Sequence, residues 1–134
     1  MIVVDASLMV AALTDDGEQG KHAYAALTSD SHWAAPAHLP VEVTSAVRGR
    51  WLARKVSDER ASHVAVTLPR LSVEFTPWGD IAERIWELRH NYTPYDAAYI
   101  ALAELRGCVL VTLDRKLANT GSHHATVHVV DAEC

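Results

Sequence analysis

Two short segments of the chain are unbroken runs of apolar, mostly β-branched residues. Residues 2–4 read Ile-Val-Val, and residues 108–112 read Cys-Val-Leu-Val-Thr. A strand with one face in water alternates apolar and polar residues, whereas a strand covered on both faces is apolar throughout. These runs therefore predict central strands of a sheet that is buried between two layers of helices.

Segments with helical periodicity separate the predicted strands. Apolar spacing and capping signals predict helices over 6–13, 18–28, 40–55, 57–68, 78–90 and 93–106, and further strands over 32–35, 71–75 and 127–130. Strands that alternate with helices favour parallel pairing, because a crossover helix joins each strand to the next. The predicted fold class is α/β, with a mainly parallel central sheet.

The length and composition agree with one globular domain over residues 1–134. The chain has 134 residues, of which 49% are hydrophobic and 22% are charged, which is ordinary for a folded domain. No apolar run reaches the ~18–20 residues of a membrane span, and no basic segment typical of a signal peptide precedes residues 2–4. The two cysteines, Cys108 and Cys134, are too few for a disulfide scaffold, so we expect a cytoplasmic protein.

Four acidic residues follow strands or begin helices. Asp5 comes directly after one apolar strand and Asp114 two residues after the end of the other, while Glu42 and Asp96 lie in the first turns of predicted helices. Each has a structural explanation, as a helix cap or as a favourable charge at a helix N-terminus. In a parallel sheet, however, all four can meet at the carboxyl edge, where open α/β sheets bind ligands.

Clustered carboxylates repel one another and lose hydration when they are partly buried. A divalent cation relieves both penalties, and Mg²⁺ prefers oxygen ligands with substrate phosphate in its shell. The cluster therefore predicts a one- or two-metal site for phosphodiester chemistry.

The sequence resembles PIN-domain ribonucleases, in particular the VapC-type toxins of bacterial toxin–antitoxin pairs. The similarity is carried by residues 1–7 (MIVVDAS), 35–36 (AP) followed by Glu42, 93–103 (TPYDAAYIALA) and 111–117 (VTLDRKL). The segment from Tyr95 to Ala103 is the most specific part. The resemblance spans nearly the whole chain.

The resemblance implies a PIN-like α/β/α sandwich with a five-stranded sheet and an endoribonuclease that depends on Mg²⁺ or Mn²⁺. It also implies a homodimer that cleaves RNA and is silenced by a cognate VapB-type antitoxin. The family's four acids correspond to Asp5, Glu42, Asp96 and Asp114, as catalytic residues and metal ligands. For Asp114, direct ligation and a water-mediated role both remain open.

Supporting roles follow from the same correspondence and from the charge pattern. Ser7 and Thr112 match the small hydroxyl positions that support the acids. Arg115 and Lys116 directly follow Asp114 and are candidates for contacts to substrate phosphate, with a solvated turn as the equal alternative.

Other polar groups have simpler explanations. The basic residues near the end of the 40–55 helix, which are Arg48, Arg50, Arg54 and Lys55, suit a helix C-terminus. His123, His124 and His128 lack the ligand spacing of a zinc site. We expect the four tryptophans to lie in the core or at an interface.

Two alternatives from other functional classes remain. A non-catalytic module would keep the fold and bind RNA or an antitoxin without cleavage. In a Mg²⁺-dependent phosphotransfer domain, acids near the first strand would bind Mg²⁺ and one aspartate would accept phosphate. Phosphatases of the haloacid-dehalogenase type carry Asp-x-Asp there, whereas this chain has Asp5-Ala6-Ser7.

The net charge of -5 argues at first against a nucleic-acid partner. Without the four clustered acids, the 17 acidic residues become 13, against 12 Lys and Arg, and the remainder carries -1. Bound cations would largely neutralise the pocket. The acidic balance is therefore compatible with RNA as substrate.

Overall fold

Five strands form one parallel sheet in the computed structural model, which describes residues 1–119 and 121–130. They are β1 (Ile2–Val4), β2 (Trp33–Pro36), β3 (Val73–Thr76), β4 (Val109–Thr112) and β5 (Val127–Val129). The strand order is β3-β2-β1-β4-β5, and every neighbouring pair is parallel. The predicted five-stranded parallel sheet is therefore confirmed, while Cys134 lies outside the described residues.

The direction of strand succession reverses between β1 and β4. The chain moves outward from β1 through β2 to β3, and then returns to the other side of β1 with β4 and β5. Val4 of β1 pairs with Val111 of β4, so the residues after these two strands emerge side by side. This is the topological switch point at which α/β sheets bind ligands.

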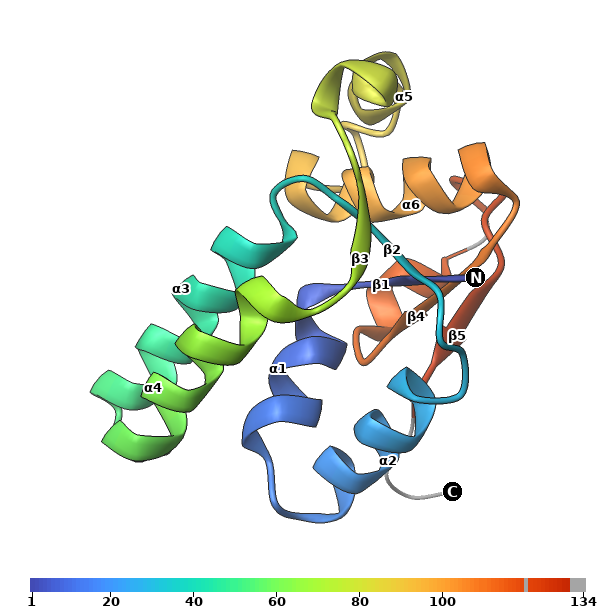
Figure 1. Ribbon diagram of the computed structural model, residues 1–134. Coiled ribbons are helices and arrows are strands. Elements are labelled where there is room, and N and C mark those ends of the chain that lie inside the picture. The colour runs from blue at the N-terminus through green and yellow to red at the C-terminus, as the bar shows by residue number, and fades with distance from the viewer. Residues whose placement is uncertain (120, 131–134) are drawn as a thin grey trace.

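Helices cover both faces of this sheet. They are α1 (Ala6–Thr14), α2 (Glu18–Leu27), α3 (Leu39–Leu52), α4 (Asp58–Thr67), α5 (Ala82–Glu87) and α6 (Pro94–Arg106), with 3₁₀ turns η1 (Leu68–Arg70), η2 (Trp78–Asp80) and η3 (Arg115–Ala118). In Figure 1, α6 lies above the strands with α5 outside it, and α1 and α2 lie below. α3 and α4 run side by side next to α1. The arrangement confirms the predicted α/β sandwich.

Local capping signals begin and end several helices where the sequence predicts. The Ser57 hydroxyl accepts a hydrogen bond from Arg60 N–H (3.0 Å), and the Thr93 hydroxyl accepts one from Asp96 N–H (3.2 Å). Gly107 ends α6 with φ +61°, in the left-handed region that glycine adopts without steric cost. The Thr93 cap orients the first turn of α6, which carries Asp96.

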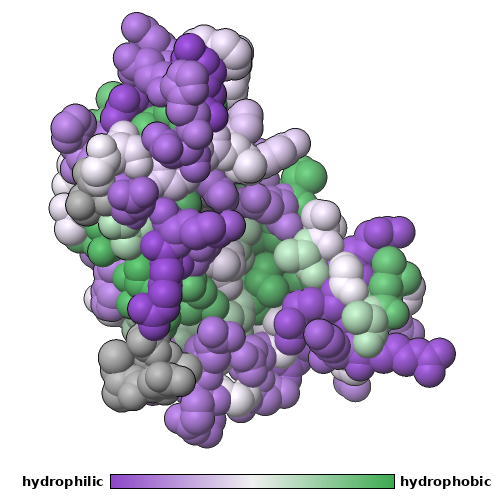
Figure 2. All heavy atoms as spheres, turned by 180° about the vertical axis from the view of Figure 1, so that it is seen from behind, coloured by the Kyte–Doolittle hydropathy of each residue, from purple (hydrophilic) through white to green (hydrophobic). Residues whose placement is uncertain are grey.

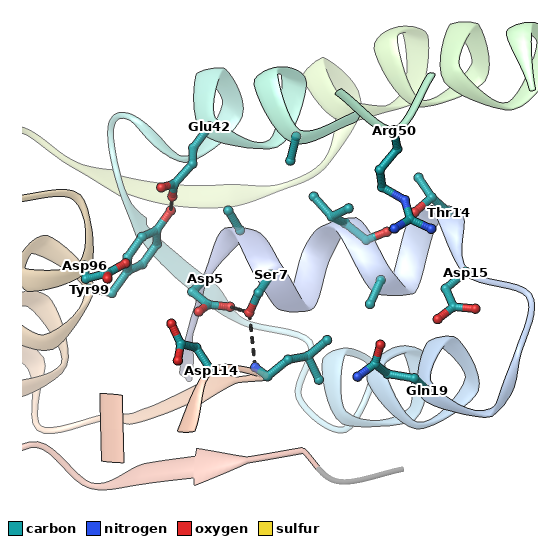
Figure 3. Close-up of a pocket in the computed structure, with 15 residues that line it drawn as sticks. Asp5, Ser7, Thr14, Asp15, Gln19, Glu42, Arg50, Asp96, Tyr99 and Asp114 are labelled. Carbon is teal, nitrogen blue, oxygen red and sulfur yellow. Dashed lines mark hydrogen bonds between the residues drawn. The ribbon is translucent and has the colours of Figure 1, made fainter. Parts of the chain in front are cut away.

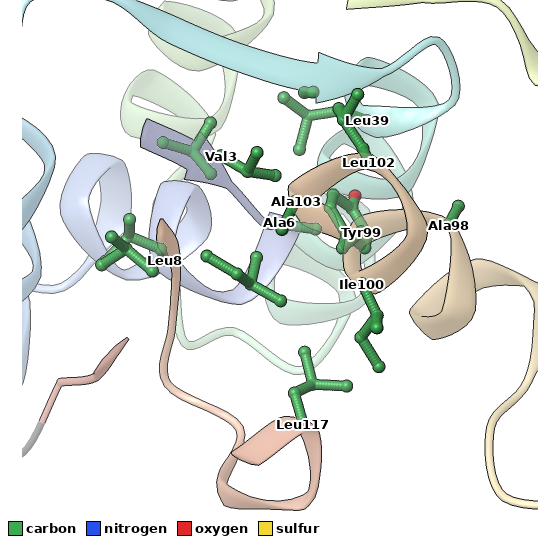
Figure 4. Close-up of a cluster of buried hydrophobic side chains, with 14 of the residues drawn as sticks. Val3, Ala6, Leu8, Leu39, Ala98, Tyr99, Ile100, Leu102, Ala103 and Leu117 are labelled. Carbon is green, nitrogen blue, oxygen red and sulfur yellow. The ribbon is translucent and has the colours of Figure 1, made fainter. Parts of the chain in front are cut away.

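The core lies between the sheet and its two helical layers. Figure 4 shows Val3 of β1, Leu8 of α1, Leu39 of α3 and Leu102 of α6 converging there. All four are 0–1% exposed. The two central strands are buried along their length, as their unbroken apolar sequences predict. This packing holds the carboxyl ends of β1 and β4 against α3 and α6.

Two local expectations are wrong. Residues 78–90 form η2 and the short α5 instead of one helix; Gly79, a poor helix former, lies within η2, and Ile81 separates the two elements. Ile81, Ile85 and Leu88 are nevertheless buried, as their helical spacing predicts. The helical spacing of Leu105 from Ala101 predicts burial on α6, but Leu105 is 58% exposed.

The tryptophans are mostly on the surface. Trp51, Trp78 and Trp86 are exposed, whereas Trp33 is half-buried and donates its indole N–H to backbone carbonyls. The core interpretation is therefore wrong for three of them. Figure 2 shows hydrophilic side chains over most of the rear face, with hydrophobic ones between them near its middle. Within the described residues, none of the helices has the length and apolar character needed to cross a bilayer.

Candidate functional site

A pocket of about 410 Å³ opens at the carboxyl ends of β1 and β4, between α1, α3 and α6. Its acidic residues come from segments that are far apart in sequence, and Figure 3 shows Asp5, Asp96 and Asp114 close together at one end with Glu42 above them. All four predicted site acids line it: Asp5, Glu42, Asp96 and Asp114. The structure thus brings the predicted residues together in a single cavity.

Asp5 is the most buried of these acids, with 5% of its surface exposed. It caps α1, because its Oδ1 accepts hydrogen bonds from Leu8 N–H (3.0 Å) and from the Ser7 hydroxyl (2.8 Å). Burial raises the pKa of Asp5 to about 6, and the hydrogen bonds from Thr112, Leu8 and Ser7 oppose that rise. Burial therefore outweighs the capping bonds and destabilises the ionised carboxylate.

The Ser7 and Thr112 hydroxyls connect Asp5 to the end of β4. Thr112, which is fully buried, donates its hydroxyl to Asp5 Oδ2. Ser7 Oγ accepts from Leu113 N–H (3.1 Å), and Thr112 Oγ1 accepts from Asp114 N–H (3.0 Å). The two hydroxyls thus hold the segment after β4 against the segment after β1.

Glu42 is held by a tyrosine that the sequence analysis did not assign to the site. The Tyr99 hydroxyl donates to Glu42 Oε1 (2.6 Å), and its oxygen accepts from the backbone N–H of Ala6. Burial and the Glu42 carboxylate raise the pKa of Tyr99 far above its usual value, so the hydroxyl stays protonated and remains a donor. His38 Nε2 lies 3.8 Å from the same Glu42 oxygen.

A sequence signal for Tyr99 did exist. Asp96 and Tyr99 are three residues apart on α6, so their side chains share one face of the helix. Two polar residues on the buried side of a helix indicate a common polar environment. Figure 3 shows both side chains beside Glu42.

Asp96 and Asp114 complete the acidic end. Burial raises the pKa of Asp96, and the neighbouring carboxylates of Asp114 and Glu42 raise it further, while Lys116 lowers it. Asp114 Oδ1 accepts from Lys116 N–H (3.0 Å) and caps η3. The predicted role of Asp114 as a helix cap therefore coexists with its place in the pocket, whereas Asp96 takes part in the Thr93 cap through its backbone N–H.

The opposite end of the pocket carries a cation. Arg50 and Ala46 of α3 line it, together with Gln19 of α2. Ala46 was expected within the buried stripe of α3, but it is exposed to the pocket. The interpretation of Arg50 as a simple helix-terminal charge also missed its position. Glu42, Ala46 and Arg50 are spaced by four residues, which is the signal for one helical face.

The donor atoms at the acidic end fit a hard divalent cation. They are carboxylate and hydroxyl oxygens, which Mg²⁺ and Mn²⁺ prefer, and no described Lys or Arg forms an ion pair with Asp5, Asp96 or Asp114. Within residues 1–119 and 121–130, no three His, Cys, Asp or Glu side chains lie close enough together to enclose an ion. Such spacing is compatible with Mg²⁺, which keeps several water ligands and few protein ligands.

The histidines near the C-terminus do not join this site. His123 is 3% exposed, and its Nδ1 accepts from Ala125 N–H (3.1 Å), so its protonated Nε2 donates to the Leu117 carbonyl (2.7 Å). Both ring nitrogens are therefore used in holding the segment between η3 and β5.

Comparisons with known proteins agree with this architecture. The family model for the PIN domain matches residues 2–122. Ribonuclease VapC9 of Mycobacterium tuberculosis is 38% identical over 130 residues, which cover 97% of this chain and 98% of that protein. Ribonuclease VapC12 of the same species is 38% identical over 96 residues, covering 72% and 74%.

Solved structures show the same fold. The sarcin-ricin loop cleaving toxin VapC20 of Mycobacterium tuberculosis superposes with a TM-score of 0.68 at 23% identity, covering 91% of this chain and 96% of that one. A toxin–antitoxin complex from Klebsiella pneumoniae has a TM-score of 0.63 at 19% identity, covering 98% of both chains. With a matching domain model over most of its length and a full-length relative above 30% identity, the chain belongs to the PIN-domain family of VapC ribonucleases.

Proposed function

We propose that the protein is the endoribonuclease toxin of a toxin–antitoxin pair and that the acidic pocket hydrolyses RNA phosphodiester bonds with Mg²⁺ or Mn²⁺. The observation that carries this proposal is the convergence of Asp5, Glu42, Asp96 and Asp114 in one cavity at the switch point of the sheet. Membership of the VapC ribonucleases supports the reaction class.

Asp5 and Asp96 would hold the metal ion, with Glu42 and Asp114 as further ligands or as groups that orient its waters. When bound, the ion lowers the pKa of a coordinated water and offsets charge that develops on the phosphate. Burial and neighbouring carboxylates raise the pKa of Asp5 and Asp96, which supports a role for such an ion. A cation would reverse both effects.

The other groups would position these acids. Ser7 and Thr112 fix Asp5 by hydrogen bonds, and Tyr99 fixes Oε1 of Glu42. Within the described residues, Oε2 of Glu42 has no hydrogen-bond donor. In this proposal, it accepts a hydrogen bond from the attacking water and orients that water toward phosphorus.

Arg115 and Lys116 lie at the start of η3, directly after Asp114. The charge of Lys116 acts on Asp96, which supports its proposed contact with a substrate phosphate near the acidic end. The same contact remains a proposal for Arg115.

The partners and the assembly are part of the proposal. A VapB-type antitoxin is supported by the VapC relatives and by the toxin–antitoxin complex with the same fold. The homodimer and the single domain over residues 1–134 remain predictions, and one sheet with one core cluster supports the latter. Light scattering gives the molar mass of the free protein, which tests the homodimer, and that of the co-expressed pair, which tests the complex with the antitoxin.

The test is cleavage of total RNA, with mapping of the new ends. Wild-type protein is expected to cleave with Mg²⁺ or Mn²⁺ and to stop with EDTA. D96N is expected to fold, because the Thr93 cap uses only the backbone N–H of residue 96, and to lose cleavage. D80N, which removes an exposed acid outside the pocket, is the matched control.

Full activity of D96N would overturn the assignment of the site. Absence of cleavage by wild-type protein across varied RNAs would favour the non-catalytic module. Phosphorylation by acetyl phosphate would favour the phosphotransfer domain.

A further inference from the structure

Arg50 lies at the far end of the acidic pocket, and no residue in the described part of the chain forms an ion pair with it. It lies on the same face of α3 as Glu42, eight residues away, which corresponds to ~12 Å along the helix axis. Both residues line the pocket, and Figure 3 shows Glu42 at its acidic end and Arg50 at the other, above Thr14 and Gln19. One face of α3 thus carries a negative and a positive group along the same cavity.

The Arg50 side chain has unused hydrogen-bonding capacity. Its Nε atom is buried and has no hydrogen-bond partner, and no ion pair of its guanidinium is found among residues 1–119 and 121–130. Buried donors in folded proteins are normally satisfied, and an unsatisfied one costs stability. Arg50 therefore requires an explanation beyond the stability of the fold.

The acids near Arg50 do not pair with it. Asp15 lines the same end of the pocket, but its Oδ1 accepts from Gly17 N–H (2.8 Å) in the loop before α2. Asp16, the next residue in the chain, pairs with Arg60 of α4 (3.0 Å). Within residues 1–119 and 121–130, no acid thus pairs with the guanidinium, which can take an anion from outside this part of the chain.

We propose that Arg50, assisted by the side-chain amide of Gln19, binds a backbone phosphate of the RNA strand away from the cleaved bond. This inference rests on the proposed ribonuclease function, because it takes the acidic end as the place of cleavage. A guanidinium matches the geometry of a phosphate with two parallel N–H donors. The exposed Gln19 amide adds uncharged donors on the facing wall.

The charge distribution of the pocket favours this use. An RNA strand that enters the acidic end meets four carboxylates, so a phosphate beyond them gains from a cation that none of the described acids neutralises. Arg48 provides the contrast, because it is exposed on α3 but lines a separate groove with Trp51 and Val64. Both arginines lie near the C-terminal end of the helix, but only Arg50 reaches the pocket.

The test compares R50Q with R48Q on an RNA oligonucleotide that spans a mapped cleavage site. R50Q is expected to raise KM about ten-fold, the effect of one charge-assisted hydrogen bond, with little change in kcat. R50Q is also expected to have a shallower dependence of log affinity on log salt concentration, by the amount that about one phosphate contact contributes. R48Q is expected to behave as wild type.

Neutral methylphosphonate linkages, placed one at a time in the RNA, locate the contact. A methylphosphonate at one linkage is expected to weaken RNA binding by the wild type and to cause no further loss of binding by R50Q. Because R50Q removes a buried Nε donor that has no partner among the described residues, its melting temperature is expected to equal or exceed that of the wild type. If R50Q fails to fold, R50K serves instead, with an intermediate KM because it keeps the charge without the two parallel donors.

A second measurement does not depend on cleavage. Fluorescence anisotropy in EDTA, with a mixed-sequence single-stranded oligoribonucleotide, is expected to show about ten-fold weaker binding by R50Q than by R48Q. Equal KM, affinity and salt dependence in R50Q and wild type would overturn the inference. So would an equal loss in R48Q, or a loss of antitoxin binding by R50Q with unchanged RNA affinity. If the wild type binds RNA through Arg50 but cleaves none, the proposed function fails and the phosphate contact stands.

Discussion

Replacing Asp5 with Asn tests the physical state of the pocket directly. Burial raises the pKa of Asp5 from 3.8 to about 6. Between these values the folded protein holds a proton that the unfolded chain has released. Raising the pH through this range removes the proton from the folded state, so the contribution of Asp5 to stability falls as pH rises. Asn is neutral at every pH and lacks this dependence.

The magnitude follows from the two pKa values. From about pH 4.5 to about pH 7.5, these values lower the free energy of unfolding of the wild type by about 2 kcal/mol. This corresponds to about 7 °C in melting temperature for a chain of this length. D5N is expected to keep the α1 cap, because an amide oxygen can still accept from Leu8 N–H. The altered contact with Thr112 costs about 1 kcal/mol at all pH values, so it leaves the pH-dependent part unchanged.

The assay is urea unfolding of both proteins in EDTA at several pH values, with D80N as a control for the loss of one negative charge. The free energy of unfolding of the wild type is expected to fall relative to D5N by about 2 kcal/mol across the range. Parallel curves would refute the argument, since they would mean that Asp5 is ionised in the folded protein throughout. D5N is also expected to lose RNA cleavage, so at neutral pH the more stable protein would be the inactive one.

Three further predictions concern the same structure. Y99F is expected to lower the free energy of unfolding by about 1–3 kcal/mol and to slow cleavage, because Glu42 loses its donor; chemical unfolding checks this, and an equal effect of Y24F at an exposed tyrosine would contradict it. G20A is expected to destabilise by about 1–3 kcal/mol, because a Cβ would lie 1.8 Å from a backbone oxygen of the preceding loop. G49A, with open space around its Cβ, is expected to stabilise by up to about 1 kcal/mol, and thermal melts of the two variants separate these cases. Saturating Mg²⁺ is expected to raise the melting temperature of the wild type at neutral pH by mass action, and an equal rise in D96N would place the ion elsewhere.

Much of the fold was predictable because its signals are local. The Ser57 and Thr93 caps act within three residues of the chain, and the two apolar strands reveal their burial in their own composition. Prediction failed where local preferences for and against a helix were nearly balanced. The segment 78–90 carries a helical apolar pattern, but it lies at the surface and contains Gly79, and it forms η2 and α5 instead of one helix.

The candidate site was predictable at the level of residue types. Strand ends and helix starts place Asp5, Glu42, Asp96 and Asp114 at one edge once the sheet is parallel, and the structure confirms that they line one pocket. Their roles as ligands and catalysts remain the proposal that the mutants test. The hydrogen bond from Tyr99 to Glu42 was not predictable, because it joins residues 57 positions apart.

The sequence by itself determined the order of strands and helices, the parallel sheet and the edge at which the acids gather. Periodicity, capping and strand topology carry this information within short segments of chain. Only the tertiary structure decided that burial would raise the pKa of Asp5, that Tyr99 would hold Glu42, and that Arg50 would line the pocket with a buried Nε that has no partner in the described part of the chain. These properties depend on how α1, α3 and α6 pack together, because desolvation and hydrogen bonding are set by neighbours that are distant in the chain.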